Sequence, residues 1–350
     1  MQGIGVVGGN TVRELVNRWG KSSAIVSATV LLVLADVIFE PSALHKSALA
    51  YVWPFSAVLI IAALGQTLII QQRGIDLSIP GYISLTVIVV THMPNGNSSK
   101  LFESIVLIFV INILAGLFSG LMVTKVGMSS IVQTLGMNAI LYGIDIAISH
   151  GTPTQTTTAL QDFTSKSFHT IPITFFIALL ITAIVGFIMK KTIAGRRFEA
   201  SGASDAAGVA AGLRTDRFQI SAYVGAAILY TIAGILLAGI VSQPDAFSGD
   251  AYLLSSVAAV VLGGTSLLGG SGSAVATAVG AFFLIMLQQF ILATGASAAV
   301  QDVVEATALA VGVGIYGFRS QSAMLVGTLR QRMNSRSSEK SGPTAKMEVS

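Results

Sequence analysis

Long apolar stretches, separated by short polar ones, run along most of this chain. Read as helices, they predict about ten membrane spans, at residues 22–39, 51–71, 79–92, 101–124, 128–149, 171–189, 218–241, 252–268, 272–293 and 299–317. The stretch at 79–92 is too short to cross a bilayer, so it predicts a half-helix or a re-entrant segment packed against protein. The glycine-joined pair at 252–268 and 272–293 can also be irregular at membrane depth. The pattern predicts an all-α, polytopic transmembrane helical bundle.

The first apolar stretch follows basic residues and has some features of a signal peptide. It is longer than a typical signal core, and about ten mostly polar residues separate it from the Ala48-Leu49-Ala50 triplet downstream. We therefore interpret it as an uncleaved first span.

The composition agrees with a membrane protein. The chain is 53% hydrophobic and 10% charged, whereas ordinary soluble domains are about 25% charged. It contains no cysteine, which excludes disulfides and cysteine-ligated metals. The net charge of +4 does not indicate nucleic-acid binding, because the basic residues flank membrane spans rather than forming one face. The surroundings expected for this chain are membrane lipid.

Basic residues are distributed unevenly between the loops, which predicts the orientation. With a cytoplasmic N-terminus, every lysine and arginine except Lys46, Lys100 and Lys166 lies on the inner side. Positive residues are retained in the cytoplasm during insertion, so both termini are expected there. The predicted parts are a cytoplasmic N-terminal segment (1–21), a transmembrane domain (22–318) and a cytoplasmic tail (319–350) that is expected to be disordered.

Residues 190–217 are the one long charged segment between the two ends of the chain, and the charge pattern makes them a cytoplasmic loop. Within it, residues 204–212 are rich in alanine. Asp205 favours the start of a short helix there and Gly212 favours its end. A short helix with small side chains suits insertion into a groove of another protein. Local chemistry alone leaves docking and simple connection equally open.

A second candidate motif is the run Arg73-Gly74-Ile75-Asp76-Leu77-Ser78 between two predicted spans. Asp76 and Ser78 are suited to cap the short helix that follows, where free backbone N–H groups need acceptors. Gly74 permits a turn that a bulkier residue resists. Capping alone explains these residues, so a chemical role does not follow from them.

A third motif, residues 259–273, reads AVVLGGTSLLGGSGS. Hydroxyls such as that of Thr265 are able to satisfy backbone groups in place of water, and the glycines permit close helix packing. A phosphate-binding loop is excluded because no lysine lies near the glycines. The structural residues of the motif are Gly263, Gly264, Thr265, Gly269, Gly270 and Gly272.

No enzymatic arrangement is present in the sequence. The four histidines fall in predicted outer loops or at span ends, and neither HExxH nor GxSxG occurs. No metal site is predicted, and no chain of deep acids and bases suggests a proton relay. We therefore expect no catalytic residues and no enzyme activity.

The three motifs together resemble the permease subunits of bacterial ATP-binding-cassette (ABC) importers for monosaccharides, the ribose/xylose/galactose-type and autoinducer-2-type group. RGIDLSIPG at 73–81 resembles that family's GGIDLSVG. AVVLGGTSLLGGSGS is similar to its AVVLGGTSLxGGxGS, and AGRRFEASGASDAAGVAAGL at 194–213 to its coupling loop. The departures are Arg73 for glycine, Pro80 for valine, Ala276 for glycine, and Asp205 for glutamate in the coupling pattern.

This resemblance implies the fold, partners and mechanism. It implies a type II-like importer permease in the bacterial inner membrane, working by alternating access. A second permease subunit, two cytoplasmic ATPase subunits and a periplasmic sugar-binding protein are the implied partners. ATP and Mg²⁺ belong to the ATPases, so no cofactor is expected on this chain. The residues implied in ATPase coupling are Asp205, Ala206, Ala207, Gly208 and Gly212.

The substrate path is the least determined part of the resemblance, because both permeases of a pair line it. Intramembrane polar residues give four candidates, Asn112, Gln133, Asn138 and Gln288. The particular sugar stays open, as does the choice between a homodimer and a heterodimer. A permease for branched-chain amino acids, a proton-coupled secondary transporter and a non-transporting scaffold remain as alternative functions.

Overall fold

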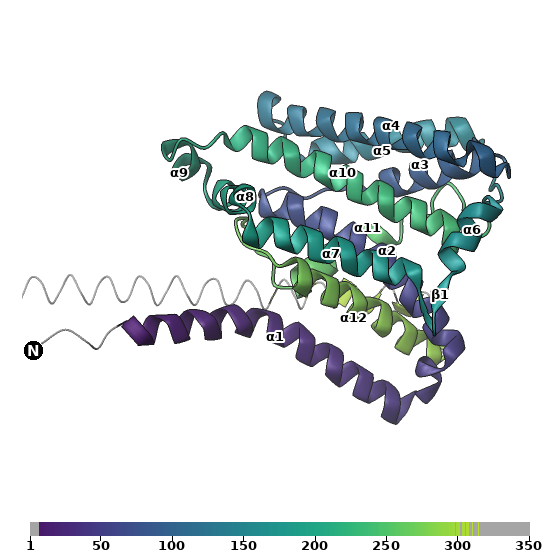
Figure 1. The fold of residues 1–350 in the computed structure, drawn as a ribbon, viewed down its shortest axis with the longest axis horizontal. Helices are drawn as coiled ribbons and strands as arrows, with labels where there is room; N and C mark the ends of the chain where they lie inside the picture. The colour runs from purple at the N-terminus through teal and green to yellow at the C-terminus, as the bar shows by residue number, and fades with distance from the viewer. Residues whose placement is uncertain are drawn as a thin grey trace, which may run out of the picture. The chain divides into compact units, whose positions relative to one another are not determined.

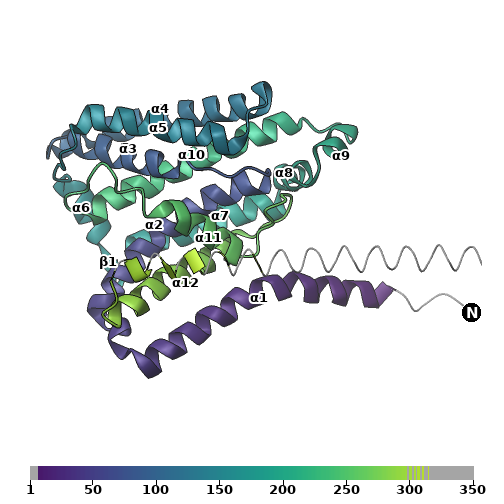
Figure 2. The same cartoon turned by 180° about the vertical axis from the view of Figure 1, so that it is seen from behind.

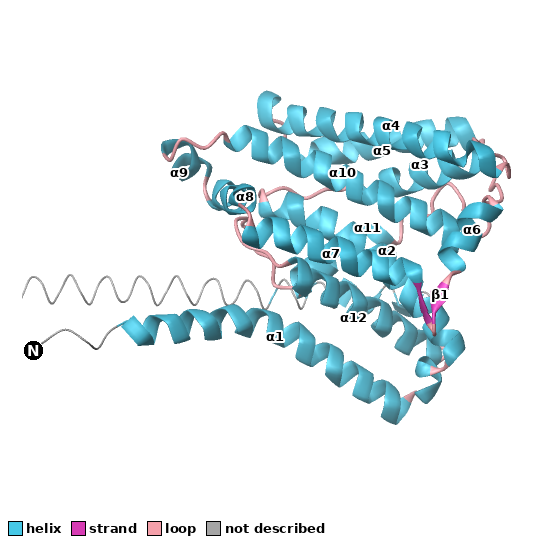
Figure 3. Cartoon of the chain, viewed as in Figure 1, coloured by secondary structure: helices cyan, strands magenta, loops and turns pink. Residues whose placement is uncertain are grey.

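The computed structural model describes residues 7–297, with residues 299–301, 303, 304, 306, 307, 310 and 314 beyond them. This part of the chain is almost entirely helical (Figure 3). The elements are α1 (Val7–Phe39), η1 (Pro41–Leu44), α2 (Lys46–Gln71), α3 (Ile79–His92), η2 (Ser98–Lys100), α4 (Leu101–Leu121), η3 (Met122–Val126), α5 (Ser130–Ser149), α6 (Thr158–Ser165), β1 (Ser167–Phe168), β2 (Ile171–Pro172), α7 (Ile173–Lys191), α8 (Ile193–Ala203), α9 (Asp205–Ala210), α10 (Thr215–Ile240), α11 (Tyr252–Leu262) and α12 (Ala274–Ala293).

Nine of the predicted apolar stretches coincide with helices, which confirms a polytopic helical bundle. Within the described residues, α2, α4, α5, α7, α10 and α12 are long and apolar enough to cross a membrane, and three shorter apolar segments belong to α1, α3 and α11. The stretch at 299–317 lies mostly outside the described residues, as does the predicted tail at 319–350. The count of ten spans therefore stays a prediction.

One of the predicted boundaries was wrong. The stretch at 252–268 is helical only to Leu262, because the glycine motif begins at Gly263 and turns the chain out of the helix at Gly264, where φ is +77°. At the other end of the chain, α1 begins at Val7 and thus extends the helix N-terminally of the predicted span at 22–39. The cytoplasmic position of segment 1–21 stays a prediction.

Helices α2 and α10 form the centre of the bundle. They pack against each other, and α2 also contacts α7, α11 and α12, while α10 contacts α3 and α4. Their approach is close because small residues face large ones: a Cβ at Gly65 would lie 2.5 Å from the ring of Tyr230. Gly116 of α4 approaches small Ala227 of α10 even without a large partner, since a Cβ at Gly116 would lie 2.8 Å from the Ala227 Cβ. Small residues at such contacts drive helix association in lipid through close van der Waals packing.

The connections gather at the two ends of the helices (Figures 1 and 2). Helices α8 and α9 lie at one end, and α6 with the β1–β2 hairpin lies at the opposite one. We call these the inner end and the outer end, because the charge pattern places the loop that carries α8 and α9 in the cytoplasm.

The half-helix expected at 79–92 is confirmed as α3, and it is enclosed by protein. Its residues from Ile79 to Thr91 are all buried. The first two turns of α3 are held from two sides. On one side, Asn138 of α5 accepts a hydrogen bond from the Gly81 N–H at 2.8 Å. From the outer end, the connection between α10 and α11 descends into the bundle, where the Gly249 N–H donates to Ser84 at 2.9 Å.

Candidate functional site

The chain break between α2 and α3 is the first component of the candidate site. Helix α2 ends at Gln71, and Arg73 then takes a left-handed conformation with φ of +66°, which is uncommon for a residue with a side chain. Buried Asp76 accepts from the Ser78 N–H at 2.8 Å and also from the Ser78 hydroxyl. The capping prediction was wrong for both residues, because no side chain caps the start of α3: Asp76 binds the N-cap residue Ser78 itself, and the Ser78 hydroxyl is used in that contact.

The second component is the glycine motif that follows α11. Gly264, Gly269 and Gly270 all have positive φ, which glycine adopts at little cost. The Gly270 N–H donates to the Gln71 carbonyl at 2.9 Å, so it satisfies a carbonyl left free at the end of α2.

The expectation that hydroxyls of the motif satisfy backbone groups is confirmed for Ser266 and Ser273, which accept from the Leu268 and Ala276 N–H groups at 3.3 Å. It was wrong for Thr265, because its hydroxyl is buried and makes no hydrogen bond.

The third component is the pair of short helices in the charged loop. The predicted helix between Asp205 and Gly212 is confirmed as α9, and the Ser204 hydroxyl caps its start by accepting from the Ala207 N–H. Gly212, with φ of +76°, ends it. Helix α8, just before it, was missed by the sequence reading, although Thr192 accepts from the Gly195 N–H as an N-cap does.

These three components meet at one place, which we call the coupling junction: Gln71–Arg73, Phe198–Asp205 and Gly269–Gly270. The backbones approach so closely that a Cβ at Gly202 would lie 1.9 Å from the Gln71 carbonyl oxygen. A Cβ at Gly269 would lie 2.5 Å from the Gly202 carbonyl oxygen. Glycine is required at these positions because only a bare backbone fits.

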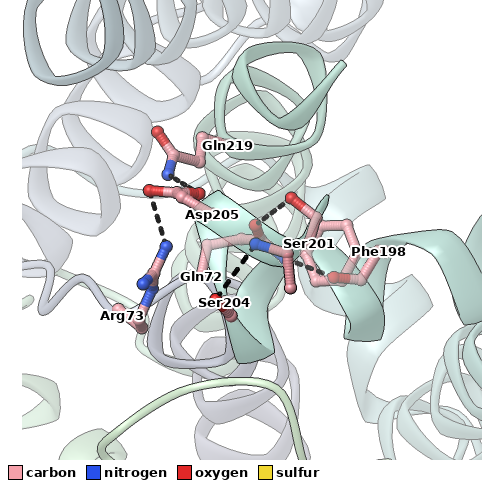
Figure 4. A network of polar contacts seen from close by, with 8 residues as sticks. Gln72, Arg73, Phe198, Ser201, Ser204, Asp205 and Gln219 are labelled. Carbon is pink, nitrogen blue, oxygen red and sulfur yellow. Dashed lines mark hydrogen bonds and ion pairs between the residues drawn. The ribbon is translucent and has the colours of Figure 1, made fainter. Parts of the chain in front are cut away.

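Side chains reinforce the coupling junction (Figure 4). Gln72 donates from Nε2 to the Phe198 carbonyl at 2.8 Å, and its Oε1 accepts from the Ser201 hydroxyl at 3.4 Å. Arg73 Nη2 lies 2.7 Å from Asp205 Oδ2. Gln219 of α10 donates to the other oxygen of Asp205 at 3.4 Å. The first residue of α9 is therefore bound both to the α2–α3 break and to a central helix.

The outward face of α9 carries small side chains. Ala206, Ala207 and Val209 are exposed, and Val209 is 62% exposed. Gly208 faces the other way, where a Cβ would lie 2.8 Å from the Thr215 methyl group. The helix thus presents a small apolar surface to the inner side while its back rests on α10, a shape suited to insertion into a groove.

The four predicted path residues do not gather at one site. Asn112 is fully buried and donates from Nδ2 to the hydroxyls of Thr86 and Thr231, at 2.9 and 2.8 Å. Gln133 is buried and donates to Ser119 at 3.1 Å. Their contribution to a path stays a prediction.

The other two path candidates lie at more open places. Asn138 supports the first turn of α3 and is half-buried. Gln288 lines a cavity of about 280 Å³ at the outer end, together with Asp245, Phe247 and Tyr252. Within the described residues, no three His, Asp or Glu side chains lie close enough to hold a metal ion.

Comparison with known proteins gives a consistent result. A family model described as "Branched-chain amino acid transport system / permease component" matches residues 48–314. A probable ABC transporter permease protein of Sinorhizobium fredii is 30% identical, over 88% of this chain and 92% of that protein. The ribose import permease protein of Haemophilus influenzae is 27% identical, over 82% and 90%. The autoinducer 2 import system permease protein of Photorhabdus laumondii is 29% identical, over 78% and 82%. No solved structure matches the chain.

Proposed function

The chain belongs to this family of transport-system permeases and is a multi-pass membrane component of an ABC importer, and on that premise we propose that it admits a monosaccharide or a similar small polar solute to the cell. Two of its relatives are named for ribose and for autoinducer 2. The family description names branched-chain amino acids instead, which makes an amino-acid permease the second candidate.

The observation that carries the proposed mechanism is the coupling junction. The exposed face of α9 docks on an ATPase subunit, and movement of that subunit displaces Asp205. Asp205 passes the displacement to the α2–α3 break through Arg73, 2.7 Å away. Gly202 and Gly270 also contact Gln71 through their backbones, and this contact is too closely packed to absorb a displacement. The α2–α3 break then moves the first turn of α3. The transport path thereby opens alternately to the two sides of the membrane.

The proposed complex has four further subunits. A second permease completes the path, two cytoplasmic ATPases hydrolyse ATP with Mg²⁺, and a periplasmic binding protein delivers the solute. This chain is then a transport subunit that binds no cofactor of its own. Its glycine motif contributes packing at the end of α2 rather than phosphate binding, because the Gly270 N–H is already used by the Gln71 carbonyl.

The test is reconstitution of the permease with an ATPase and a periplasmic binding protein of its importer. Proteoliposomes that contain all components should take up a radiolabelled sugar from a panel of pentoses and hexoses, and uptake should require internal ATP. Preferred uptake of leucine or isoleucine would support the amino-acid alternative. Transport by the permease alone, driven by a proton gradient, would contradict an ATP-driven importer, and a complex whose ATPase activity ignores every solute would indicate a scaffold.

A further inference from the structure

Two separate segments place four side chains beside the first turn of α3: Asn138 and Tyr142 of α5, and Phe247 and Asp250 of the connection before α11. We call these four the α5 cluster. The Tyr142 hydroxyl donates to Asp250 Oδ1. The rings of Tyr142 and Phe247 lie with their centroids 5.6 Å apart and their planes inclined by 46°. The cluster therefore combines a carboxylate, an amide and two aromatic rings.

The α5 cluster is firmly supported from behind. Gly249, next to Asp250, is buried and donates its N–H to Ser84 of α3 at 2.9 Å. A Cβ at Gly249 would lie 2.2 Å from the Pro80 carbonyl oxygen, so this connection has no room to shift toward α3. Asn138 is fixed by its bond from the Gly81 N–H. The backbone that carries these side chains is therefore held against α3 by hydrogen bonds and close packing.

The front of the cluster is open and keeps unused polar atoms. Phe247 is 54% exposed, Asp250 is exposed and Tyr142 is half-buried. Within the described part of the chain, Asn138 Nδ2 and Asp250 Oδ2 have no hydrogen-bond partner. One donor and one acceptor therefore face outward beside an exposed aromatic ring.

The depth of the cluster determines what it faces. Tyr142 precedes the outer end of α5 at Ser149 by seven residues, or roughly 10 Å at 1.5 Å per residue. A carboxylate at that depth is costly against lipid and normally faces a partner or a water-filled cavity. Small residues such as Ala139 and Gly143 are exposed beside it on α5, together with the larger Leu135 and Ile146. The open side of the Asp250 carboxylate therefore requires a polar partner or an aqueous space at this depth.

The chemistry of the cluster fits a polyhydroxylated solute. A carboxylate accepts hydrogen bonds from neighbouring hydroxyls, an amide N–H donates to a further oxygen, and an aromatic ring covers the apolar C–H face of a sugar ring. A transport site must also release its solute, so a few exposed contacts suit it better than full enclosure. Resting on the proposed function, we propose that the α5 cluster binds the hydroxyls of a monosaccharide during its passage and contributes to the choice between sugars.

The experiment uses the full complex in proteoliposomes, supplied with saturating sugar-loaded binding protein. The variants are Asp250→Asn, Tyr142→Phe and Phe247→Ala. Matched controls are Asp162→Asn, an exposed outer-end carboxylate outside the cluster, and Phe102→Ala, a 75% exposed ring on α4. Measured are the uptake rates of the preferred sugar and of its epimers in the panel, the ATPase activity without solute, and the ratio of permease to ATPase in the purified complex.

We expect Asp250→Asn to lower uptake of the preferred sugar about tenfold and to change its ratio to the epimers, since a hydrogen bond to a charged group is lost. Phe247→Ala and Tyr142→Phe should each lower uptake about threefold. Solute-free ATPase activity should stay within about twofold of the wild type, and both controls should behave as the wild type does.

Unchanged epimer ratios in all three variants, with sugar uptake intact in the wild type, would overturn the inference and leave the proposed function standing. Loss of a permease subunit from the purified complex, with ratios unchanged, would also overturn it, since the cluster would then be a contact between permeases. Absence of sugar uptake by the wild-type complex would overturn the proposed function and this inference together.

Discussion

The coupling junction lies at the end of α2, where the α2–α3 break begins, and the α5 cluster lies beside the first turn of α3 after the break. The two sites are built from different chemical groups. At the coupling junction, backbone meets backbone: Gly202 and Gly270 touch the end of α2 at Gln71 with no space for a side chain. In the α5 cluster, the side chains of Tyr142 and Asp250 contact each other and project from a fixed backbone. One Asp250 oxygen has no hydrogen-bond partner within the described residues.

The difference in composition indicates that the coupling junction transmits movement and that the α5 cluster distinguishes solutes. Contacts between bare backbones transmit displacement because close-packed atoms cannot yield, but they cannot distinguish one solute from another. Exposed carboxylate, amide and ring groups can distinguish solutes, but they transmit little displacement because they are not closely packed. Changes of size should therefore damage the coupling junction, and changes of chemistry should damage the α5 cluster. The following variants test this contrast, in order of decreasing expected effect.

The largest effect is expected at α9. Replacing Asp205 and Gly212 together with bulky residues (Asp205→Trp, Gly212→Val) should abolish uptake and co-purification of the ATPase while membrane insertion continues. Gly212 has φ of +76°, which a β-branched residue tolerates poorly, so the end of the docking helix is lost. Gly151→Val is the matched control, because Gly151 has φ of +71° and no neighbour within 4 Å, but lies at the outer end. Normal co-purification with the double variant would contradict the docking assignment.

A single methyl group at the junction should have the next largest effect. Gly202→Ala places a Cβ 1.9 Å from the Gln71 carbonyl oxygen. Overpacking of this kind typically costs about 1–3 kcal/mol, and we expect uptake to fall about tenfold or more. Gly186→Ala in α7 adds the same methyl where the nearest atom is 3.7 Å away, and should leave uptake unchanged. Equal uptake by both variants would show that the coupling junction can accommodate an added methyl group.

The ion pair between Arg73 and Asp205 should have a moderate effect. Arg73→Asp and Asp205→Arg should each reduce sugar-stimulated ATPase activity about three- to fivefold, while the double exchange recovers to within about twofold of the wild type. The effect is modest because the side chains are 33% and 49% exposed, and exposed pairs contribute about 1 kcal/mol or less.

Lys125→Glu is the control for this exchange. Lys125 is paired with Asp216 at the same inner end but does not touch the α2–α3 break. Its reversal should change the stimulated activity less than twofold. A double exchange that remains as impaired as the single variants would exclude the ion pair as the link between α9 and the break.

The smallest effect is expected at Thr265. Its buried hydroxyl has no partner, so Thr265→Val should leave uptake unchanged and raise the Tm by about 1–3 °C, as removal of an unsatisfied polar group is favourable. Thr67→Val is the contrasting control, because the Thr67 hydroxyl donates to the Ala63 carbonyl at 2.8 Å and its loss should lower the Tm. A lower Tm for Thr265→Val would assign a structural bond to the motif's hydroxyl.

Local signals in the sequence predicted the elements well. The bounds of α3 follow from a 14-residue apolar run between a glycine turn and a polar loop, and those of α9 from Asp205 and Gly212. These features depend on neighbours in the chain, and neighbours are visible in a sequence. The end of α11 was placed too late because hydropathy continues through Leu267 and Leu268, while the glycines before them had already ended the helix.

The sites depend on contacts between distant residues, and these were not predictable in the same way. Arg73 is visible as a departure from the glycine of the resembling motif, but its partner Asp205 lies in another motif. Nothing local to Asp250 reveals that its connection descends to Ser84 of α3. In α5 the exposed residues, such as Leu135 and Ile146, are as apolar as the buried ones, so the sequence does not mark its open face.

The shortness of α3 also bears on how the protein is made. A 14-residue helix is too short to span the bilayer by itself, and its enclosing partners include α5, α10 and α11. The last of these is complete only at Leu262, about 170 residues after α3 ends at His92. At synthesis rates of about 5–20 residues per second, α3 waits on the order of ten seconds for its final neighbour. During biogenesis the nascent chain must therefore shelter this segment in the insertion machinery or against α2, which makes it a point of vulnerability to quality-control proteolysis.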